Sequence, residues 1–172
     1  MSVVAGNNNE QTISTVTDTH GNVAQRVTGS HVFSPYVYSG ASLEIWCFPN
    51  YPGGTVRIKA SWPQGGGYSQ TRVAEYHGIA LTTPVDNVAP ARATARIQSA
   101  PMAMSHSSDL ILAVWMSMST GCTAATGFTD RTPGGVYFED IQTIAAGSLT
   151  VTQNGCANNW FVGAFVGFIS TG

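Results

Sequence analysis

Charged side chains are scarce in this chain: of its 172 residues, seven are Lys or Arg and nine are Asp or Glu. A folded domain usually has about a quarter of its residues charged. Ser, Thr, Asn and Gln far outnumber the charged residues here, so the surface meets water mainly through hydroxyl and amide groups. Such a composition is more typical of secreted, adhesive or assembled proteins than of cytosolic enzymes.

Basic runs and long apolar runs are also missing. The chain has a single lysine, Lys59, and its arginines are scattered. No stretch can neutralise several phosphates, which disfavours nucleic-acid binding. The longest apolar-rich segment, residues 160–169, is too short for a membrane helix. We therefore expect no nucleic-acid partner and no membrane insertion.

The first residues, Met-Ser-Val-Val-Ala-Gly-Asn-Asn-Asn, have neither the basic start nor the long apolar centre of a signal peptide. Either the protein is made without a signal peptide, or the sequence begins after a removed segment, with Met1 added. We expect the second, and hence an extracellular or cell-surface location.

Catalytic and metal-binding spacings are lacking as well. The four histidines show neither the H-x-H nor the H-x3-H spacing of a transition-metal site. The motif G-x-S-x-G is absent, and the run Ser-His-Ser-Ser-Asp at 105–109 reads as a polar loop, because neighbours along a chain point apart. We expect no enzyme and no cofactor. Among metals, calcium fits the sequence best, because loops supply oxygen ligands from Asp18, Asn22, Asp86, Asn87 and Asp130. No calcium-loop motif occurs, however.

Three cysteines are present, an odd number. Cys122 and Cys156 both lie in Gly-containing, turn-like contexts, and they are the candidate disulfide pair if the compartment is oxidising. Cys47 alternates with Leu43 and Ile45, so we expect a buried thiol that behaves as a small hydrophobic residue. The alternative is three reduced, unrelated cysteines.

Short β-branched or aromatic runs recur along the chain between Gly, Pro and Asn residues, and no helix-period segment stands out. Residues 1–172 are expected to form one all-β domain, an antiparallel two-sheet β-sandwich of jelly-roll type, with a barrel as the alternative. About ten strands are predicted, at 12–18, 23–28, 42–48, 55–62, 71–77, 92–99, 109–118, 136–144, 147–152 and 159–170.

Some of these segments carry more specific signals. Residues 55–62 alternate, which predicts a half-buried strand, whereas 109–118 and 159–170 are apolar on both faces, which indicates central strands. Gly163 and Gly167 interrupt the last strand and predict bulges or close backbone approach. Residues 82–90 read as irregular.

Six short phrases follow one another along the chain: Val-Thr-Asp-Thr-His-Gly-Asn at 16–22, Ala-Glu-Tyr-His-Gly at 74–78, Pro-Val-Asp-Asn at 84–87, Gly-Phe-Thr-Asp-Arg at 127–131, Glu-Asp at 139–140 and the apolar run 160–168. Over about residues 12–169 this pattern resembles uncharacterised secreted bacterial β-sandwich domains found in large surface proteins. The resemblance implies a further N-terminal strand before the counterpart of residues 2–5. The chain would then lack an edge strand, or receive one from a neighbouring molecule. It brings no catalytic residues.

Acidic residues on predicted strands are further site candidates. Glu75 and His77 share one face of their predicted strand, where they can orient each other or hold a metal. Glu44, Glu139 and Asp140 add carboxylates on other strands. We expect structural or edge-protecting roles for them rather than acid–base work.

Aromatic residues in loops are the best candidates for ligand binding. Tyr36, Tyr38, Tyr51, Trp62 and Tyr68 fall in or beside the predicted loops, where flat rings can stack on sugars or anchor a protein partner. The alternative is that these rings cover sheet edges.

The function expected first is that of a non-enzymatic extracellular structural or adhesive subunit. It would act through protein–protein contacts or self-assembly at exposed strand edges. Residues 1–9, or the open edge beside them, would be the interaction element, with the apolar C-terminal strand as their neighbour. A carbohydrate-binding module or lectin using the loop aromatics is the alternative, and a phage or viral surface protein is the second alternative.

Overall fold

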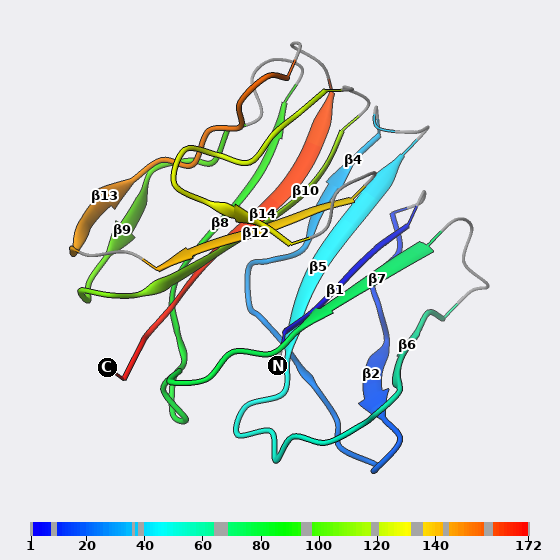
Figure 1. Cartoon of the computed structure of the whole chain (residues 1–172). Coiled ribbons are helices and arrows are strands. Elements are labelled where there is room, and N and C mark those ends of the chain that lie inside the picture. Colours follow the sequence, from blue (N-terminus) through cyan, green and yellow to red (C-terminus); the bar gives the residue numbers. More distant parts are fainter. Residues whose placement is uncertain are drawn as a thin grey trace.

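The protein is an all-β molecule (Figure 1). The computed structural model describes residues 2–7, 10–35, 37, 40–63, 69–93, 98–117, 121–131, 136–142, 145–156 and 160–171. Its strands are β1 (Ser2–Asn7), β2 (Thr15–Asp18), β3 (Gln25–Arg26), β4 (Val32–Ser34), β5 (Ala41–Cys47), β6 (Ile58–Ser61), β7 (Ser69–Ala74), β8 (Val85–Ala93), β9 (Met102–Met104), β10 (Leu110–Ser117), β11 (Thr129–Asp130), β12 (Val136–Gln142), β13 (Gly147–Leu149) and β14 (Phe161–Phe168).

Two antiparallel sheets form the centre of the molecule. The N-terminal sheet has the order β3-β5-β1-β7, with β4 also paired to β5, and the C-terminal sheet has the order β11-β12-β10-β14-β8. The main core lies between them, where Leu43 and Ile45 from β5 pack with Leu112 and Val114 from β10. The all-β antiparallel sandwich predicted from the sequence is confirmed, and jelly-roll connectivity stays a prediction.

Two small sheets cover the outer faces of this sandwich. The β9–β13 pair packs on the C-terminal sheet, with Met102 and Met104 against Ile111 and Phe165. The β2–β6 pair packs on the N-terminal sheet, with Val16 against Trp46. Figure 1 shows these two pairs at opposite sides of the molecule. The fold therefore has four layers. Within the described residues, no helix is long and apolar enough to cross a membrane.

Strands β10 and β14 occupy the middle of the C-terminal sheet, as their double-sided hydrophobicity predicts. They pair with each other from Leu110↔Phe168 to Ser117↔Phe161, and each has a second neighbour, β12 or β8. Every residue of β14 is buried. Because both faces of these strands are covered, apolar residues can follow one another without alternation.

The N-terminal strand corrects one expectation. Residues 2–7 do not leave an open edge beside the C-terminal strand, because β1 is hydrogen-bonded to β5 on one side and to β7 on the other. Ser2 lies opposite both Cys47 and Ala74. Among the described strands, β7 forms one edge of this sheet, because it pairs with β1 alone, and β3 and β4 form the other edge, because each pairs with β5 alone.

A second correction concerns residues 82–90, for which the sequence predicts irregular structure. Most of this segment belongs to β8, which forms one edge of the C-terminal sheet and includes Pro90. Proline has no backbone N–H, so within sheets it is confined to edge strands, strand starts and bulges. The predicted strand at 92–99 is therefore wrong in its bounds, since β8 ends at Ala93; residues 94–97 lie outside the described part. Arg92 ties this edge to the N-terminal sheet by donating to the carbonyl of Phe33 at 2.8 Å.

Gly167 lies at a register shift and against a close-packed side chain. The register shifts between Gly167 and Phe168 where β14 pairs with β8. A Cβ atom added to Gly167 would lie 2.1 Å from Cε and 3.0 Å from Sδ of Met104, which itself is buried. The β9–β13 pair therefore sits on β14 through the space that this glycine leaves free.

We predict that Gly167→Ala lowers the free energy of unfolding by about 1–3 kcal/mol, the usual cost of overpacking a filled core. In a Met104→Ala background, the side chain that the new methyl group meets is gone, so the same substitution should cost much less. Urea denaturation of the two single variants and the double variant measures both costs. Equal losses in the two backgrounds would contradict the proposed contact.

Candidate functional site

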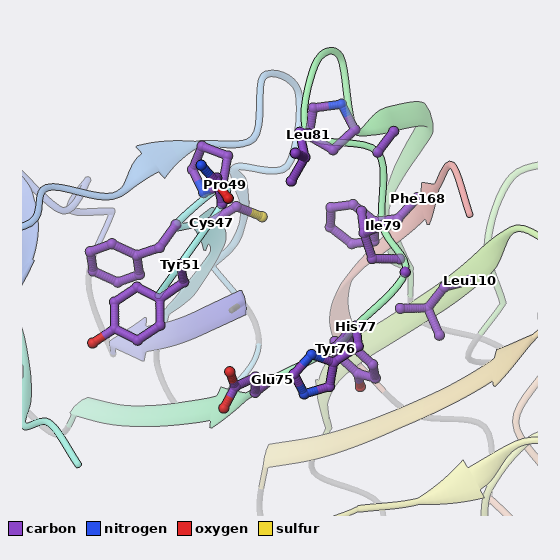
Figure 2. A pocket seen from close by; sticks show the side chains of 15 residues that line it. Cys47, Pro49, Tyr51, Glu75, Tyr76, His77, Ile79, Leu81, Leu110 and Phe168 are labelled. Atoms are coloured by element: carbon purple, nitrogen blue, oxygen red, sulfur yellow. The ribbon is translucent and has the colours of Figure 1, made fainter. Parts of the chain in front are cut away.

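A pocket of about 250 Å³ opens at one end of the sandwich (Figure 2). Its walls come from the segments that follow β5 and β7, from Pro84, from the start of β10 and from the end of β14. The residues that line it are Cys47, Phe48, Pro49, Asn50, Tyr51, Glu75, Tyr76, His77, Gly78, Ile79, Ala80, Leu81, Pro84, Leu110 and Phe168. This volume is just below the usual range for small-molecule sites, about 300–1,000 Å³. It suits one or two side chains, or one small ring.

The pocket joins an apolar interior to a polar rim. Ile79, Leu110 and Phe168 belong to or pack against the main core, so the interior is a continuation of that core. Glu75 and His77 are exposed. Leu81 is also exposed, at 65 %, and Figure 2 shows it at the mouth opposite Pro49. A single exposed leucine is ordinary on a protein surface, but this one borders a recess that continues the main core.

Tyr51 forms one wall and is held from behind. Its ring packs on Phe48, with centroids 5.6 Å apart and planes tilted by 58°, and its hydroxyl donates to Oδ2 of Asp18 at 2.8 Å. Burial, followed by the hydrogen bond and the negative charge of Asp18, raises the pKa of Tyr51 to about 12. The hydroxyl is therefore a protonated donor committed to Asp18.

Asp18 organises the turn behind Tyr51. Its Oδ1 accepts hydrogen bonds from the backbone N–H groups of His20 and Asn22, and its Oδ2 accepts from the side chains of Asn22 and Tyr51, all at 2.7–2.8 Å. Gly21 has φ +86°, which the turn requires. Burial alone would raise the pKa of Asp18, but these hydrogen bonds outweigh it and lower the pKa to about 2. Asp18 and Asn22, the expected calcium ligands, are thus hydrogen-bonded to each other, and the Asp18 carboxylate caps the turn.

A carboxylate also holds the opposite wall, beyond the pocket. Asp140 on β12 accepts a hydrogen bond from the hydroxyl of Tyr76 at 2.6 Å and two from the guanidinium of Arg131, at 2.7 and 2.9 Å. Burial and the bond to Asp140 raise the pKa of Tyr76. This contact ties the segment after β7 to the C-terminal sheet. The segments 74–78, 127–131 and 139–140, which are separate in the sequence, therefore meet at Asp140.

The other predicted carboxylates take structural places. Glu44 is buried and accepts from the indole N–H of Trp46 at 2.8 Å. Glu139 is buried as well and accepts from Gln153 and from the backbone of Ala125; burial raises its pKa despite these bonds. Of the three candidate glutamates, Glu44, Glu75 and Glu139, Glu75 is the one that lines the pocket. The predicted strand 71–77 ends at Ala74, so Glu75 and His77 lie beyond it in the pocket wall.

The predicted aromatic platform is placed only in part. Tyr36, Tyr38 and Tyr68 lie outside the described residues. Tyr51 forms the pocket wall, and Trp62 is half-buried against the outer cluster around Trp46. Much of the surface of both described rings is thus covered by neighbouring side chains.

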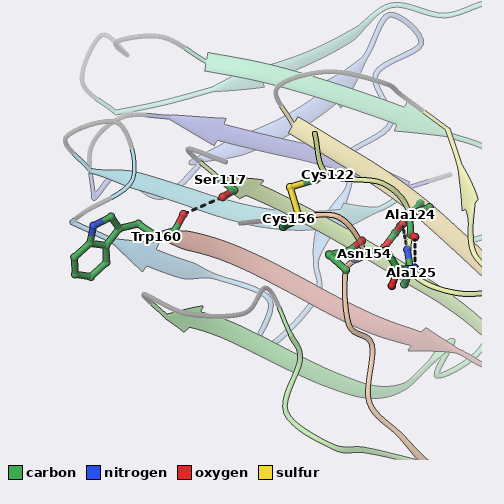
Figure 3. The surroundings of a disulfide bond; sticks show 9 residues. Ser117, Cys122, Ala124, Ala125, Asn154, Cys156 and Trp160 are labelled. Carbon is green, nitrogen blue, oxygen red and sulfur yellow. Dashed lines mark hydrogen bonds between the residues drawn. A yellow bond between two sulfur atoms is a disulfide. The ribbon is translucent and has the colours of Figure 1, made fainter. Parts of the chain in front are cut away.

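Cys122 and Cys156, the expected pair, form a disulfide (Figure 3). The bond joins the segment after β10 to the segment before β14. Next to it, Thr123 pairs with Asn154, whose amide donates to the carbonyl of Ala124 at 3.0 Å. Cys47, outside the disulfide, is only partly buried and lines the pocket, which corrects the expectation of a buried thiol.

Two pocket residues escaped the sequence reading. Leu81 ends the short apolar run Ile79-Ala80-Leu81, and a run of three residues is too short to carry a periodic signal. Cys47 continues the alternation of β5 and packs against the main core, and nothing in the sequence indicates that it also borders the pocket.

Comparison of the chain with protein-family models, with curated proteins and with solved structures finds no match. The resemblance to secreted bacterial β-sandwich domains therefore stays a prediction.

The Asp18 turn gives a pH prediction. The pKa of Asp18 is about 2 in the folded chain and about 3.8 without these contacts, so its contribution to stability is complete above about pH 5 and is lost as the pH falls towards 2. The stability advantage of the wild type over Asp18→Asn should shrink over that range. Denaturation curves at several pH values measure it, and a constant difference would argue against the turn.

The disulfide gives a second prediction. It joins residues 34 positions apart, and a loop of that length corresponds to about 3–4 kcal/mol of stability. Reducing agent should lower the free energy of unfolding of the wild type by about that amount. It should leave a Cys122→Ser/Cys156→Ser variant unchanged, and an equal response of the two proteins would contradict the assignment.

Proposed function

We propose that this protein is a non-enzymatic extracellular structural or adhesive subunit that works by contact between copies of itself, and that the end pocket is its contact site. One observation carries the proposal: Leu81, 65 % exposed, stands at the mouth of an apolar pocket. A patch that holds both an apolar projection and an apolar recess is complementary to itself. Two copies related by a two-fold axis would each place Leu81 in the pocket of the other.

The energetics favour such an exchange. Fully burying one leucine side chain is worth roughly 1.5–3 kcal/mol, and a two-fold contact makes that gain twice. Within the described residues, the large hydrophobic side chains that remain exposed are Val23, Val73 and Leu81. Leu81 is the one that lies at the pocket, and it is the most exposed of the three.

The rim of the pocket suits a second copy as well. It offers a carboxylate, Glu75, and an imidazole, His77, both exposed. The chain carries few charges overall, with a net charge of −2, so repulsion between copies is weak. Electrostatics of this kind set specificity and orientation more than affinity.

An extracellular location is part of the proposal. The disulfide supports it, because disulfides persist mainly in oxidising compartments. The charge-poor, hydroxyl-rich composition supports it too. A phage or viral surface protein remains the alternative source of such a subunit, and a lectin function would depend on Tyr36, Tyr38 and Tyr68.

Leu81→Glu tests the contact. We expect the wild type to show a concentration-dependent dimer in size-exclusion chromatography with light scattering, and Leu81→Glu to remain a monomer at concentrations where the wild type associates. The thiol of Cys47 gives a second readout, because Figure 2 shows its sulfur at the pocket. Its reaction with a maleimide should be slower in the associated protein.

Val23→Glu is the matched control. Val23 is exposed to 62 %, close to the value for Leu81, but it follows the Asp18 turn and does not line the pocket. This variant should associate like the wild type. A wild type that stays monomeric at every concentration, or a dimer that Leu81→Glu leaves intact, would overturn the proposal.

A further inference from the structure

Three metal-ligating side chains meet at the start of β8, outside the pocket lining. Asp86 lies on β8, and His106 and Asp109 come from the loop between β9 and β10. One ligand atom from each of the three side chains lies within 4.8 Å of the other two. Oδ1 of Asp86 and Nδ1 of His106 are 3.6 Å apart.

The surrounding chain holds this group in place. Oδ2 of Asp86 accepts from the backbone N–H of Ser105 at 2.7 Å, and Oδ1 accepts from the hydroxyl of Ser105. The same hydroxyl lies 2.9 Å from Nδ1 of His106. Asn87, the expected calcium partner of Asp86, instead donates to the carbonyl of Ala103 at 2.9 Å.

Burial separates this group from an ordinary acidic surface patch. Asp109 is completely buried, and the side chain of Asp86 is only 8 % exposed. The imidazole of His106 is 49 % exposed, so the group is open to solvent on its histidine side. Two buried carboxyl groups side by side are costly when both are ionised, and either a proton shared between them or a bound cation relieves that cost.

We propose that Asp86, His106 and Asp109 form a binding site for a first-row divalent cation, with Zn²⁺ as the best fit. Zinc takes imidazole nitrogen and carboxylate oxygen at about 2.0–2.2 Å, often with three protein ligands and an open fourth position. Ligands of a tetrahedral ion at that distance lie about 3.3 Å apart, close to the 3.6 Å between Asp86 and His106. The nitrogen ligand favours zinc over calcium, which prefers oxygen.

The geometry also argues against a hydrolytic triad in the run 105–109. The hydroxyl of Ser105 is bonded to Asp86, and His106 faces both groups with the same nitrogen, Nδ1. A triad needs one imidazole nitrogen for the nucleophile and the other for the acid. A cation at this point would instead join the start of β8 to the β9–β10 loop.

Titration of the full chain with Zn²⁺ in a calorimeter tests the site. We expect one saturable site per chain. At a free Zn²⁺ concentration about 100-fold above the dissociation constant, the melting temperature should rise by roughly 5–10 °C. His106→Ala and Asp86→Asn should each weaken binding by about tenfold or more.

His20→Ala is the matched control, because it removes another exposed imidazole and leaves the backbone bond of His20 to Asp18 available; its Zn²⁺ binding should equal that of the wild type. His106→Ala keeps the test decisive if the aspartate variants fold poorly, since the side chain of His106 is half exposed. Absence of saturable binding would overturn the site. Binding that His106→Ala leaves intact, or that only Cys47→Ser removes, would overturn it as well.

Discussion

The C-terminal sheet must be covered on both faces, and the rest of the fold follows from that constraint. Along β10, Leu112 and Val114 face the main core while Ile111 and Ala113 face the β9–β13 pair. Leaving either face in water would expose a continuous apolar surface. The N-terminal sheet covers one face and β9–β13 the other, and β2–β6 in turn covers the back of the N-terminal sheet. The chain has only 16 charged residues, seven Lys or Arg and nine Asp or Glu, to place in this framework.

Several of those charged residues act inside the structure as hydrogen-bond centres. Asp18 accepts three hydrogen bonds from its own turn and a fourth from Tyr51. Asp140 accepts hydrogen bonds from Arg131 and from Tyr76, which lies in the segment after β7. Ionised carboxylates make stronger hydrogen bonds than neutral groups, so one carboxylate can fix several segments. These two centres stand behind opposite walls of the end pocket. Four of the six short phrases, at 16–22, 74–78, 127–131 and 139–140, thus contribute to these two hydrogen-bond centres. The proposed contact residue, Leu81, belongs to none of the six.

The hydrophobic pattern of the sequence predicted the burial of individual strands better than it predicted which strands are neighbours. It predicted β10 and β14 as central, and it identified Gly167 as a point of close approach. It missed that β1 lies between β5 and β7, because pairing partners depend on the whole sheet. It misread 82–90 because Pro90 is a strand breaker except at an edge. Of the pocket, the sequence suggested Tyr51, Glu75 and His77; the recess itself arises where loops from distant segments converge.

Pro90 has a consequence for strand addition at one edge of the C-terminal sheet. Edge strands are where sheets recruit further strands, and unlimited recruitment produces fibrils. A strand that added to β8 would meet a proline near the middle of β8, where a backbone N–H is missing, so a continuous ladder of hydrogen bonds cannot form along this edge. None of the described residues that line the end pocket belongs to β8, so a contact made there would need no strand addition at β8.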